Sequence, residues 1–232
     1  MSKNTKASPK ISPSRTLVMF SGGIDSTAAL WHALHNPDTY GEVHVHHIHM
    51  QNIEARWKAE ARAVEAVLEY IRKNAPQSFT KSESAINTPH FGGKFLFDTE
   101  VVSFMTGYMT SRDPMITKVV IGATGTDFAM GASQAVARGK AIHNAFHTNI
   151  KDHSGAVKVY PHADLTKEEV YKALPPELAA LTWSCRTPHY VDGRAIECGR
   201  CKTCTLELKN INRPSSPGKR KTQSIRDESK IQ

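Results

Sequence analysis

Short apolar runs alternate along the chain with longer stretches in which apolar residues recur every three or four positions. The short runs have the length and composition of buried strands, and they cover 16–20, 43–50, 118–124 and 156–161. The longer stretches have the period of an amphipathic helix, and they cover 27–35, 55–72, 94–110, 132–148 and 165–174. Strands that alternate with helices of this length predict an α/β fold with a doubly wound, Rossmann-like parallel sheet.

The remaining segments divide the chain into parts. Residues 76–93 are polar and interrupted by glycine and proline, which predicts a loop. We expect one α/β domain over 16–180, a small region over 181–212 that holds every cysteine, and tails at 1–15 and 213–232. The tails are rich in serine, proline and lysine, a composition too polar to offset its ordering entropy, so we expect them to be disordered.

The charge of the chain is concentrated at its ends. Of the net charge of +8, the two tails carry +4 each, so the body between them holds 20 basic and 20 acidic residues. A weak nucleic-acid contact through the tails is the alternative to simple solvation. No apolar run approaches the ~20 residues that span a bilayer, and the basic N-terminus lacks the apolar segment of a secretory signal. We therefore expect a cytoplasmic protein without a membrane segment.

The sequence SGGIDST, residues 21–27, lies between the first expected strand and the first expected helix. Its two glycines let backbone N–H groups approach an anion closely, and its hydroxyl side chains add hydrogen-bond donors at a helix N-terminus. Asp25 in this setting indicates a phosphate that is chelated by a metal, such as Mg-ATP. The loop lacks the lysine of a Walker A motif and the spacing of a dinucleotide motif. A glycine–serine turn without a ligand is the alternative.

All four cysteines lie within twenty residues, in the spacing C-x12-C-x2-C-x2-C. They are Cys185, Cys198, Cys201 and Cys204. Four thiolates in a tetrahedral array satisfy a structural zinc ion, and this spacing is typical of such sites. An iron–sulfur cluster is the main alternative. A redox C-x-x-C pair leaves two cysteines unexplained, and disulfides do not suit a cytoplasmic chain.

Histidines occur in two further groups that we do not expect to bind metal. In VHVHHIHM (43–50) the side chains of a strand alternate, so each face holds at most two neighbouring imidazoles. His49 and Met50, at the end of this strand, are instead placed to meet the adenine and ribose of a nucleotide. His143 and His147 are four residues apart on an expected helix, but no glutamate follows His143 as in a zinc-protease motif.

The loop and the cysteines together resemble one family, the 7-cyano-7-deazaguanine (preQ0) synthases of the PP-loop ATP pyrophosphatase superfamily. SGG-x-DS is similar to the PP-loop signature. VVIGATGTD (119–127) resembles the family's strand that ends in a glycine and an aspartate, and YPHADLTKEEV (160–170) resembles its Leu-Thr-Lys segment. LTWSC (181–185) followed by CGRCKTC (198–204) is the most specific stretch. The resemblance covers residues 16–212.

The resemblance implies the ATP-dependent conversion of 7-carboxy-7-deazaguanine and ammonia into the nitrile preQ0. ATP adenylates the carboxylate, ammonia displaces AMP to give an amide, and a second adenylation permits loss of water. The implied catalytic residues are Ser21, Asp25, Ser26 and Lys167. The implied nucleotide contacts are Ser21, Gly22, Gly23, Asp25, Ser26, Thr27, His49, Met50, Gly122 and Asp127. The implied cofactors are ATP, Mg²⁺ and Zn²⁺, with zinc on the four cysteines, and the implied assembly is a homodimer.

Two segments depart from the family's usual sequence: HFGGKFLFDTE (90–100) and MGASQAVAR (130–138). Both belong to the side of the family's pocket that binds the base, where Arg138 is the candidate for a family arginine. A branch that stops at 7-amido-7-deazaguanine, or that serves DNA modification or another acceptor, therefore stays open. Another PP-loop enzyme of tRNA modification or sulfur transfer is the runner-up. A silent nucleotide- or nucleic-acid-binding module is the alternative outside enzymes.

Overall fold

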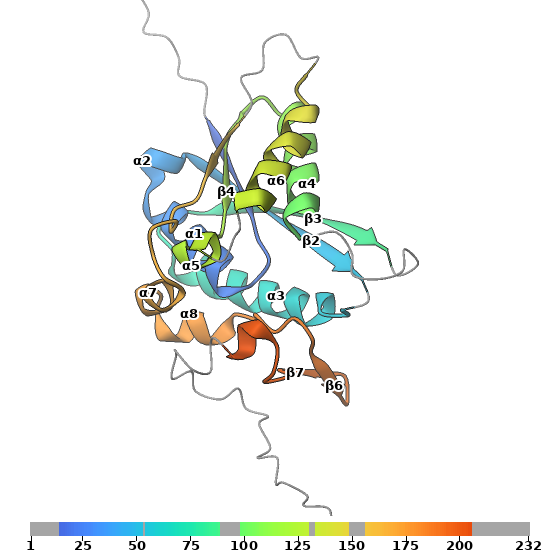
Figure 1. Ribbon diagram of the computed structural model, residues 1–232. Coiled ribbons are helices and arrows are strands. Elements are labelled where there is room, and N and C mark those ends of the chain that lie inside the picture. The colour runs from blue at the N-terminus through green and yellow to red at the C-terminus, as the bar shows by residue number, and fades with distance from the viewer. Residues whose placement is uncertain (1–13, 53, 89–97, 130–132, 149–155, 206–232) are drawn as a thin grey trace, which may run out of the picture.

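The computed structural model describes residues 14–52, 54–88, 98–129, 133–148 and 156–205 (Figure 1). The expectation of disordered tails falls almost wholly outside these residues. Most of the departing segment 90–100 and the start of the segment 130–138 also lie outside them.

A five-stranded parallel sheet forms the centre of the molecule, in the order β3-β2-β1-β4-β5 (Figure 1). The strands are β1 (Arg15–Met19), β2 (Glu42–Gln51), β3 (Phe79–Asn87), β4 (Ile116–Ile121) and β5 (Val157–Val159). Because β1 is the central strand, the loop at its carboxyl end is flanked by the ends of β2 and β4. The predicted α/β fold with a parallel sheet is confirmed.

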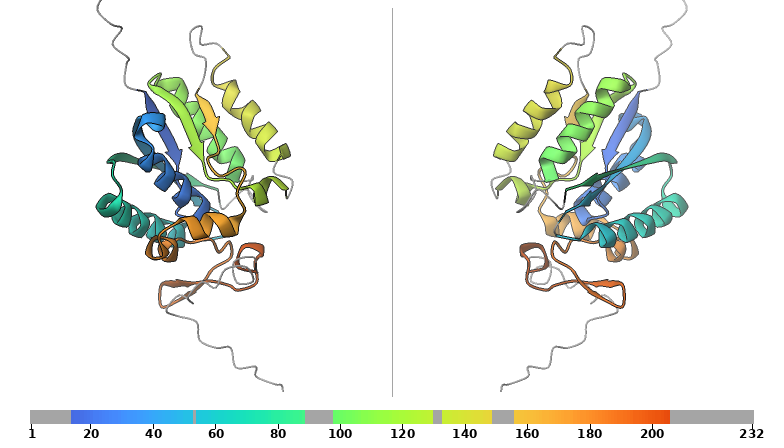
Figure 2. Two further views of the ribbon diagram at one scale, coloured as in Figure 1. Left: turned by 90° about the vertical axis from the view of Figure 1, so that its left-hand side faces the viewer. Right: turned by 90° about the vertical axis from the view of Figure 1, so that its right-hand side faces the viewer.

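Helices cover both faces of this sheet (Figures 1 and 2). One face carries α1 (Ile24–His35), α3 (Trp57–Asn74), α7 (Lys167–Ala173) and α8 (Pro176–Leu181). The other carries α4 (Asp98–Arg112), with α6 (Ser133–Ala145) packed beside it. Two short helical turns follow α1 and β4: α2 (Pro37–Tyr40) and α5 (Gly125–Asp127).

The strand β1 ends in the apolar residues Leu17, Val18 and Met19, because both of its faces are buried there. Val18 belongs to the cluster under α1 and α3, whereas Leu17 and Met19 pack on the side of α4. Leu17 and Val18 are completely buried. A continuous apolar run of this kind identifies a central strand, and the other predicted strands and helices also lie within about four residues of their expected limits.

The prediction of a loop over 76–93 is wrong, because β3 lies within it and forms one edge of the sheet. Its side chains are half-buried or exposed, as suits an edge strand, so the segment is polar. Ser82 Oγ lies 2.7 Å from both His44 Nε2 and His46 Nδ1 of β2. Since these partners are distant in sequence, the local pattern of 76–93 does not reveal them.

After α8 the chain forms a small hairpin of β6 (His189–Val191) and β7 (Arg194–Ile196), which lies beyond α3 (Figures 1 and 2). Asp192 and Gly193 form its turn with φ of 47° and 72°, the two positive angles of a type I′ turn. This hairpin fills the long spacer between the first and second cysteines. Among the described residues, no helix has the length and apolarity to cross a membrane.

Candidate active site and metal centre

The loop that follows β1 leads directly into the first turn of α1. The hydroxyl oxygens of Ser21 and Ser26 lie 3.1 Å apart, and Ser26 Oγ also donates a hydrogen bond to the carbonyl of Gly23 at 3.1 Å. These bonds fold the loop against the helix N-terminus. Unpaired backbone N–H groups and the helix dipole both favour an anion at that position.

Two glycines permit this arrangement. Gly22 has a φ of +75°, and a Cβ there would lie 3.0 Å from the backbone nitrogen of Val64 on α3. Gly122, directly after β4, packs against the loop from the other side: a Cβ there would lie only 2.5 Å from the backbone nitrogen of Ser26. The first turn of α1 is thus held between α3 and the end of β4.

A lysine between two aspartates lies beside the loop. Lys167 Nζ is 3.1 Å from Asp25 Oδ2 and 3.3 Å from Asp127 Oδ1. Thr166 caps the helix on which Lys167 stands, and Asp127 accepts a hydrogen bond from the backbone N–H of Thr124 at 3.0 Å. Burial lowers the pKa of Lys167, but the two carboxylates outweigh it and raise the pKa above its usual value. The lysine is therefore a fixed cation.

The loop and this cluster open into a cavity of about 580 Å³, a volume typical of small-molecule sites. Its walls come from the ends of β1, β2 and β4, from α4 and α6, and from the region that holds the cysteines. The expected nucleotide contacts that line it are Ser21, Gly23, Asp25, Ser26, Met50, Gly122 and Asp127. The predicted catalytic residue Lys167 lines it as well.

The other expected contacts lie elsewhere. Gly22 shapes the loop without lining the cavity, and Thr27 is completely buried in α1. His49 points to the opposite face of β2 from Met50, and its Nε2 lies 3.3 Å from Glu83 Oε2. In its place His46 lines the cavity. Its pKa is lowered to about 4, mainly by burial, so the ring is neutral.

A buried charge cluster at the cavity wall escaped the sequence analysis. Arg56 contacts the carboxylates of Glu54, Glu60 and Asp98 at 2.9, 3.1 and 2.6 Å. Burial raises the pKa of Glu60 to about 7 against the opposing influence of Arg56. Arg56 and Glu60 are four residues apart at the start of an amphipathic helix, a pattern usually found on solvated surfaces. From the sequence alone, their i,i+4 spacing therefore predicts an ion pair on the surface of a helix.

Lys158 of β5 is a second residue that escaped the sequence analysis. It lines the cavity between α4 and α6, where its Nζ lies 3.3 Å from the carbonyl of Gly139 and 3.4 Å from Ser103 Oγ. Arg138, the candidate for the family arginine, forms an ion pair with Glu100 at 2.9 Å and does not line the cavity. The cation that the cavity presents on this side is thus Lys158.

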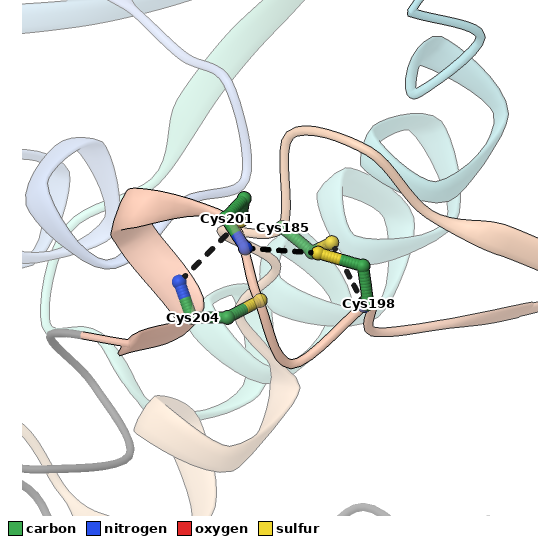
Figure 3. Close-up of side chains that lie close together, drawn as sticks. All are labelled: Cys185, Cys198, Cys201 and Cys204. Atoms are coloured by element: carbon green, nitrogen blue, oxygen red, sulfur yellow. Dashed lines mark hydrogen bonds between the residues drawn. The ribbon is translucent and has the colours of Figure 1, made fainter.

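The four cysteine side chains point toward one another (Figure 3), and their sulfur atoms all lie within 4.8 Å of each other. A tetrahedral zinc thiolate with Zn–S bonds of about 2.3 Å has sulfur atoms about 3.8 Å apart, so the donor set fits this ion. Backbone N–H groups of Cys198 and Cys201 donate to the preceding cysteine sulfur at 3.3 and 3.2 Å. These bonds stabilise thiolates, as a metal site requires.

The region that holds the cysteines is also hydrogen-bonded to the loop of residues 21–27, the candidate phosphate loop. The backbone N–H of Trp183 donates to the carbonyl of Gly22 at 2.9 Å, and the indole N–H of Trp183 donates to the carbonyl of Cys185 at 3.0 Å. Arg186 reaches Asp98 at 3.3 Å. Since Trp183 and Arg186 both line the cavity, the cluster supports one of its walls.

The histidines form no metal cluster among the described residues. His143 and His147 face α4, where they lie within 3.1 and 3.0 Å of the hydroxyls of Thr106 and Thr110. His47 Nδ1 lies 2.8 Å from the carbonyl of Phe20, on the face of β2 opposite His46. The alternation expected for the strand histidines therefore holds.

A model of the family described as "Queuosine biosynthesis protein QueC" matches residues 15–213. The chain belongs to the QueC family. The match includes both the phosphate loop and all four cysteines. The loop and the cysteine region, which both contribute to the cavity wall, are therefore parts of one family pattern. The description of the QueC family names queuosine biosynthesis, and membership of this family confirms the resemblance found in the sequence.

Solved structures support the fold of this QueC-family chain. It is similar to the U34-tRNA thiolase NcsA from Methanococcus maripaludis with its [4Fe-4S] cluster, with a TM-score of 0.52 and 13% sequence identity. The similarity covers 85% of this chain and 64% of the thiolase, so this chain spans less than two thirds of that protein. No curated protein matches the chain. At this identity the likeness concerns the fold alone.

Proposed function

We propose that this chain converts 7-carboxy-7-deazaguanine and ammonia into 7-cyano-7-deazaguanine at the expense of ATP. The observation that carries the proposal is that one cavity joins the phosphate loop and the Asp25–Lys167–Asp127 cluster to a separate polar lining on α3, α4 and β5. The loop has the chemistry to hold a nucleotide, and the separate lining leaves room for an acceptor. Family membership supports the deazaguanine acceptor.

In the first step a carboxylate oxygen of the acceptor attacks the α-phosphorus of ATP, and pyrophosphate leaves with the electrons of the broken P–O bond. The hydroxyls of Ser21 and Ser26 and the N–H groups of the loop hold the phosphates. Lys167, held beside the loop by Asp25 and Asp127, neutralises charge that develops on the pyrophosphate. The carboxylate, a poor electrophile, thereby gains a leaving group.

Ammonia then attacks the acyl carbon, the C–O bond to AMP breaks, and AMP leaves with the electron pair. The oxygen of the resulting amide attacks a second ATP and releases pyrophosphate. Loss of AMP and of the two protons on nitrogen leaves the nitrile. Because both adenylations require the same in-line geometry at the α-phosphorus, one loop serves both, and holding the reactants in place supplies much of the rate.

Two metals belong to this proposal. The carboxylates of Asp25 and Asp127 lie beside the loop, on either side of Lys167 Nζ, and carboxylates of this kind bind Mg²⁺ together with substrate phosphates. Magnesium, when bound, neutralises phosphate charge. Zinc on the four cysteines would hold the wall formed by Trp183 and Arg186 and takes no part in the reaction. A cytoplasmic homodimer without stable nucleic-acid contacts completes the proposal.

A reaction that ends at 7-amido-7-deazaguanine is the second candidate. It is favoured by one observation: Arg138, expected on the base-binding side, pairs with Glu100 and does not line the cavity. The described lining of the acceptor side therefore lacks the arginine that the resemblance led us to expect there.

The test is an incubation of the metal-replete protein with 7-carboxy-7-deazaguanine, ammonium and Mg-ATP, followed by mass spectrometry of the base. We expect the nitrile, with the amide as an intermediate. Amide alone would support the second candidate, and neither product would refute both. The Ser21→Ala and Asp25→Ala variants, in which the loop loses a donor or its carboxylate, are expected to form no AMP.

A further inference from the structure

Four basic side chains, two lysines and two arginines, line the described part of the cavity: Arg56, Lys158, Lys167 and Arg186. Three of them have carboxylate partners. Lys167 contacts two aspartates, Arg56 contacts three acidic residues, and Arg186 contacts Asp98. The exception is Lys158, since none of the described carboxylates lies within ion-pair distance of its Nζ.

Among the residues that the structure describes, the contacts of Lys158 are neutral. Its ammonium group contacts the carbonyl of Gly139 and the hydroxyl of Ser103, both at the long end of hydrogen-bond distances. The charge of Lys158 acts on His143, whose pKa is lowered to about 4 by burial and, next, by that charge. A neutral histidine supplies no counter-charge. Burial likewise lowers the pKa of Lys158 itself.

A half-buried ammonium group for which none of the described carboxylates provides a counter-charge is costly, and an anionic ligand relieves that cost. The phosphates of ATP have their own donors at the loop, where Lys167 and the N-terminus of α1 lie. Lys158 approaches the cavity from β5 and from the groove between α4 and α6, which is the acceptor side of the lining. An acceptor that carries a carboxylate supplies the missing charge.

We propose that Lys158 binds the carboxylate of the acceptor before its adenylation and so makes the first step of the reaction selective for an anionic acceptor. This inference rests on the proposed function and assigns one residue of the same cavity. It separates the two adenylations, because the acceptor of the first is an anion and the acceptor of the second, the amide, is neutral. Lys158 then contributes to the first and not to the second.

The experiment measures kcat and KM separately for 7-carboxy-7-deazaguanine and for 7-amido-7-deazaguanine, each with saturating Mg-ATP. In Lys158→Met, which keeps the length and the apolar stem of the side chain, KM for the carboxylate is expected to rise about 30-fold or more, as for the loss of one partner of a buried ion pair. KM for the amide is expected to change by less than about threefold, because no charged contact is lost. Lys158→Arg is expected to restore most of the affinity for the carboxylate.

Lys118→Met provides the matched control. Lys118 is a strand lysine on β4, next to β5, its Nζ donates to the carbonyl of Thr39, and it lies outside the cavity. We expect this variant to keep both KM values. Normal turnover of the amide by Lys158→Met would also show that the variant is folded.

Three results would overturn the inference. Equal losses for the carboxylate and the amide would place Lys158 on the shared base or in a structural role. A rise in KM for ATP alone would assign Lys158 to the nucleotide phosphates. If the wild-type protein converted neither acceptor, the proposed function itself would fail and the inference with it, whereas a working wild-type protein without the split in KM would overturn the role of Lys158 alone.

Discussion

Gly122→Ala is the substitution that most directly tests how the fold positions the phosphate loop. The added Cβ would lie 2.5 Å from Ser26 N and 2.6 Å from the Asp25 carbonyl carbon. An unstrained contact between such atoms is about 3.5 Å, so the first turn of α1 would have to move by about 1 Å. Displacements of that size cost on the order of 100-fold in rate, and overpacking of this kind costs about 1–3 kcal/mol in stability.

The assay measures nucleotide affinity by calorimetry and AMP formation by chromatography, with the thermal midpoint as a record of stability. Gly107→Ala is the matched control, because its Cβ would lie 2.5 Å from Phe146 Cδ2, in the α4–α6 contact and away from the loop. We expect both variants to lose stability and Gly122→Ala alone to lose about 100-fold in AMP formation. Unchanged affinity and AMP formation in Gly122→Ala would refute the reasoning.

Three further predictions concern the charges and the metal. Lys167→Met leaves Asp25 and Asp127 without their shared cation, so AMP formation is expected to fall about 100-fold or more in a single-turnover assay; an unchanged rate would contradict its role. Cys198→Ser is expected to abolish stoichiometric zinc in elemental analysis and to lower the Tm, whereas iron with acid-labile sulfide in the wild type would show that the cluster is not a zinc site. Glu60 is expected to make the free energy of unfolding fall as the pH rises from about 4.5 to about 7, because its pKa is raised to about 7 in the folded chain, where it then binds more protons than in the unfolded chain. Buried histidines such as His46 and His143, whose pKa values are lowered to about 4, contribute in the opposite direction below about pH 6.5. Glu60→Gln removes the contribution of Glu60 to the slope in urea titrations, and equal slopes in the two proteins would count against it.

The central part of the fold could be predicted because its signals are local. The run 17–20 is apolar on every residue, and the glycines and hydroxyl side chains that follow it at the start of a helix favour an anion site. The cysteine spacing is equally local, and the structure brings the four sulfur atoms together. Neither prediction required knowledge of distant contacts.

The features that could not be predicted depend on which elements meet in space. The polar side chains of β3 are satisfied by histidines of β2, so their pattern resembles that of a loop when read alone. The charge of Arg56 is buried by carboxylates from α3 and α4, although its spacing from Glu60 is typical of a helix surface.

His49 and Met50 were both expected to meet the nucleotide, but adjacent residues of a strand point to opposite faces, and only one face of β2 meets the cavity. The position of α4 decides this, and Met50 lies on its side. Lys158 is a similar case. It can bind an anionic ligand because none of the described carboxylates of α4 and α6 pairs with its Nζ, and the sequence does not show this. Such information comes from packing.

The ratio of AMP to nitrile formed from 7-carboxy-7-deazaguanine, ammonium and Mg-ATP tests the central claim most directly. We predict two AMP for each nitrile, with the amide rising and then falling in a quenched time course, and no AMP from the Ser21→Ala variant. AMP at the level of that variant, with neither amide nor nitrile, would contradict the account.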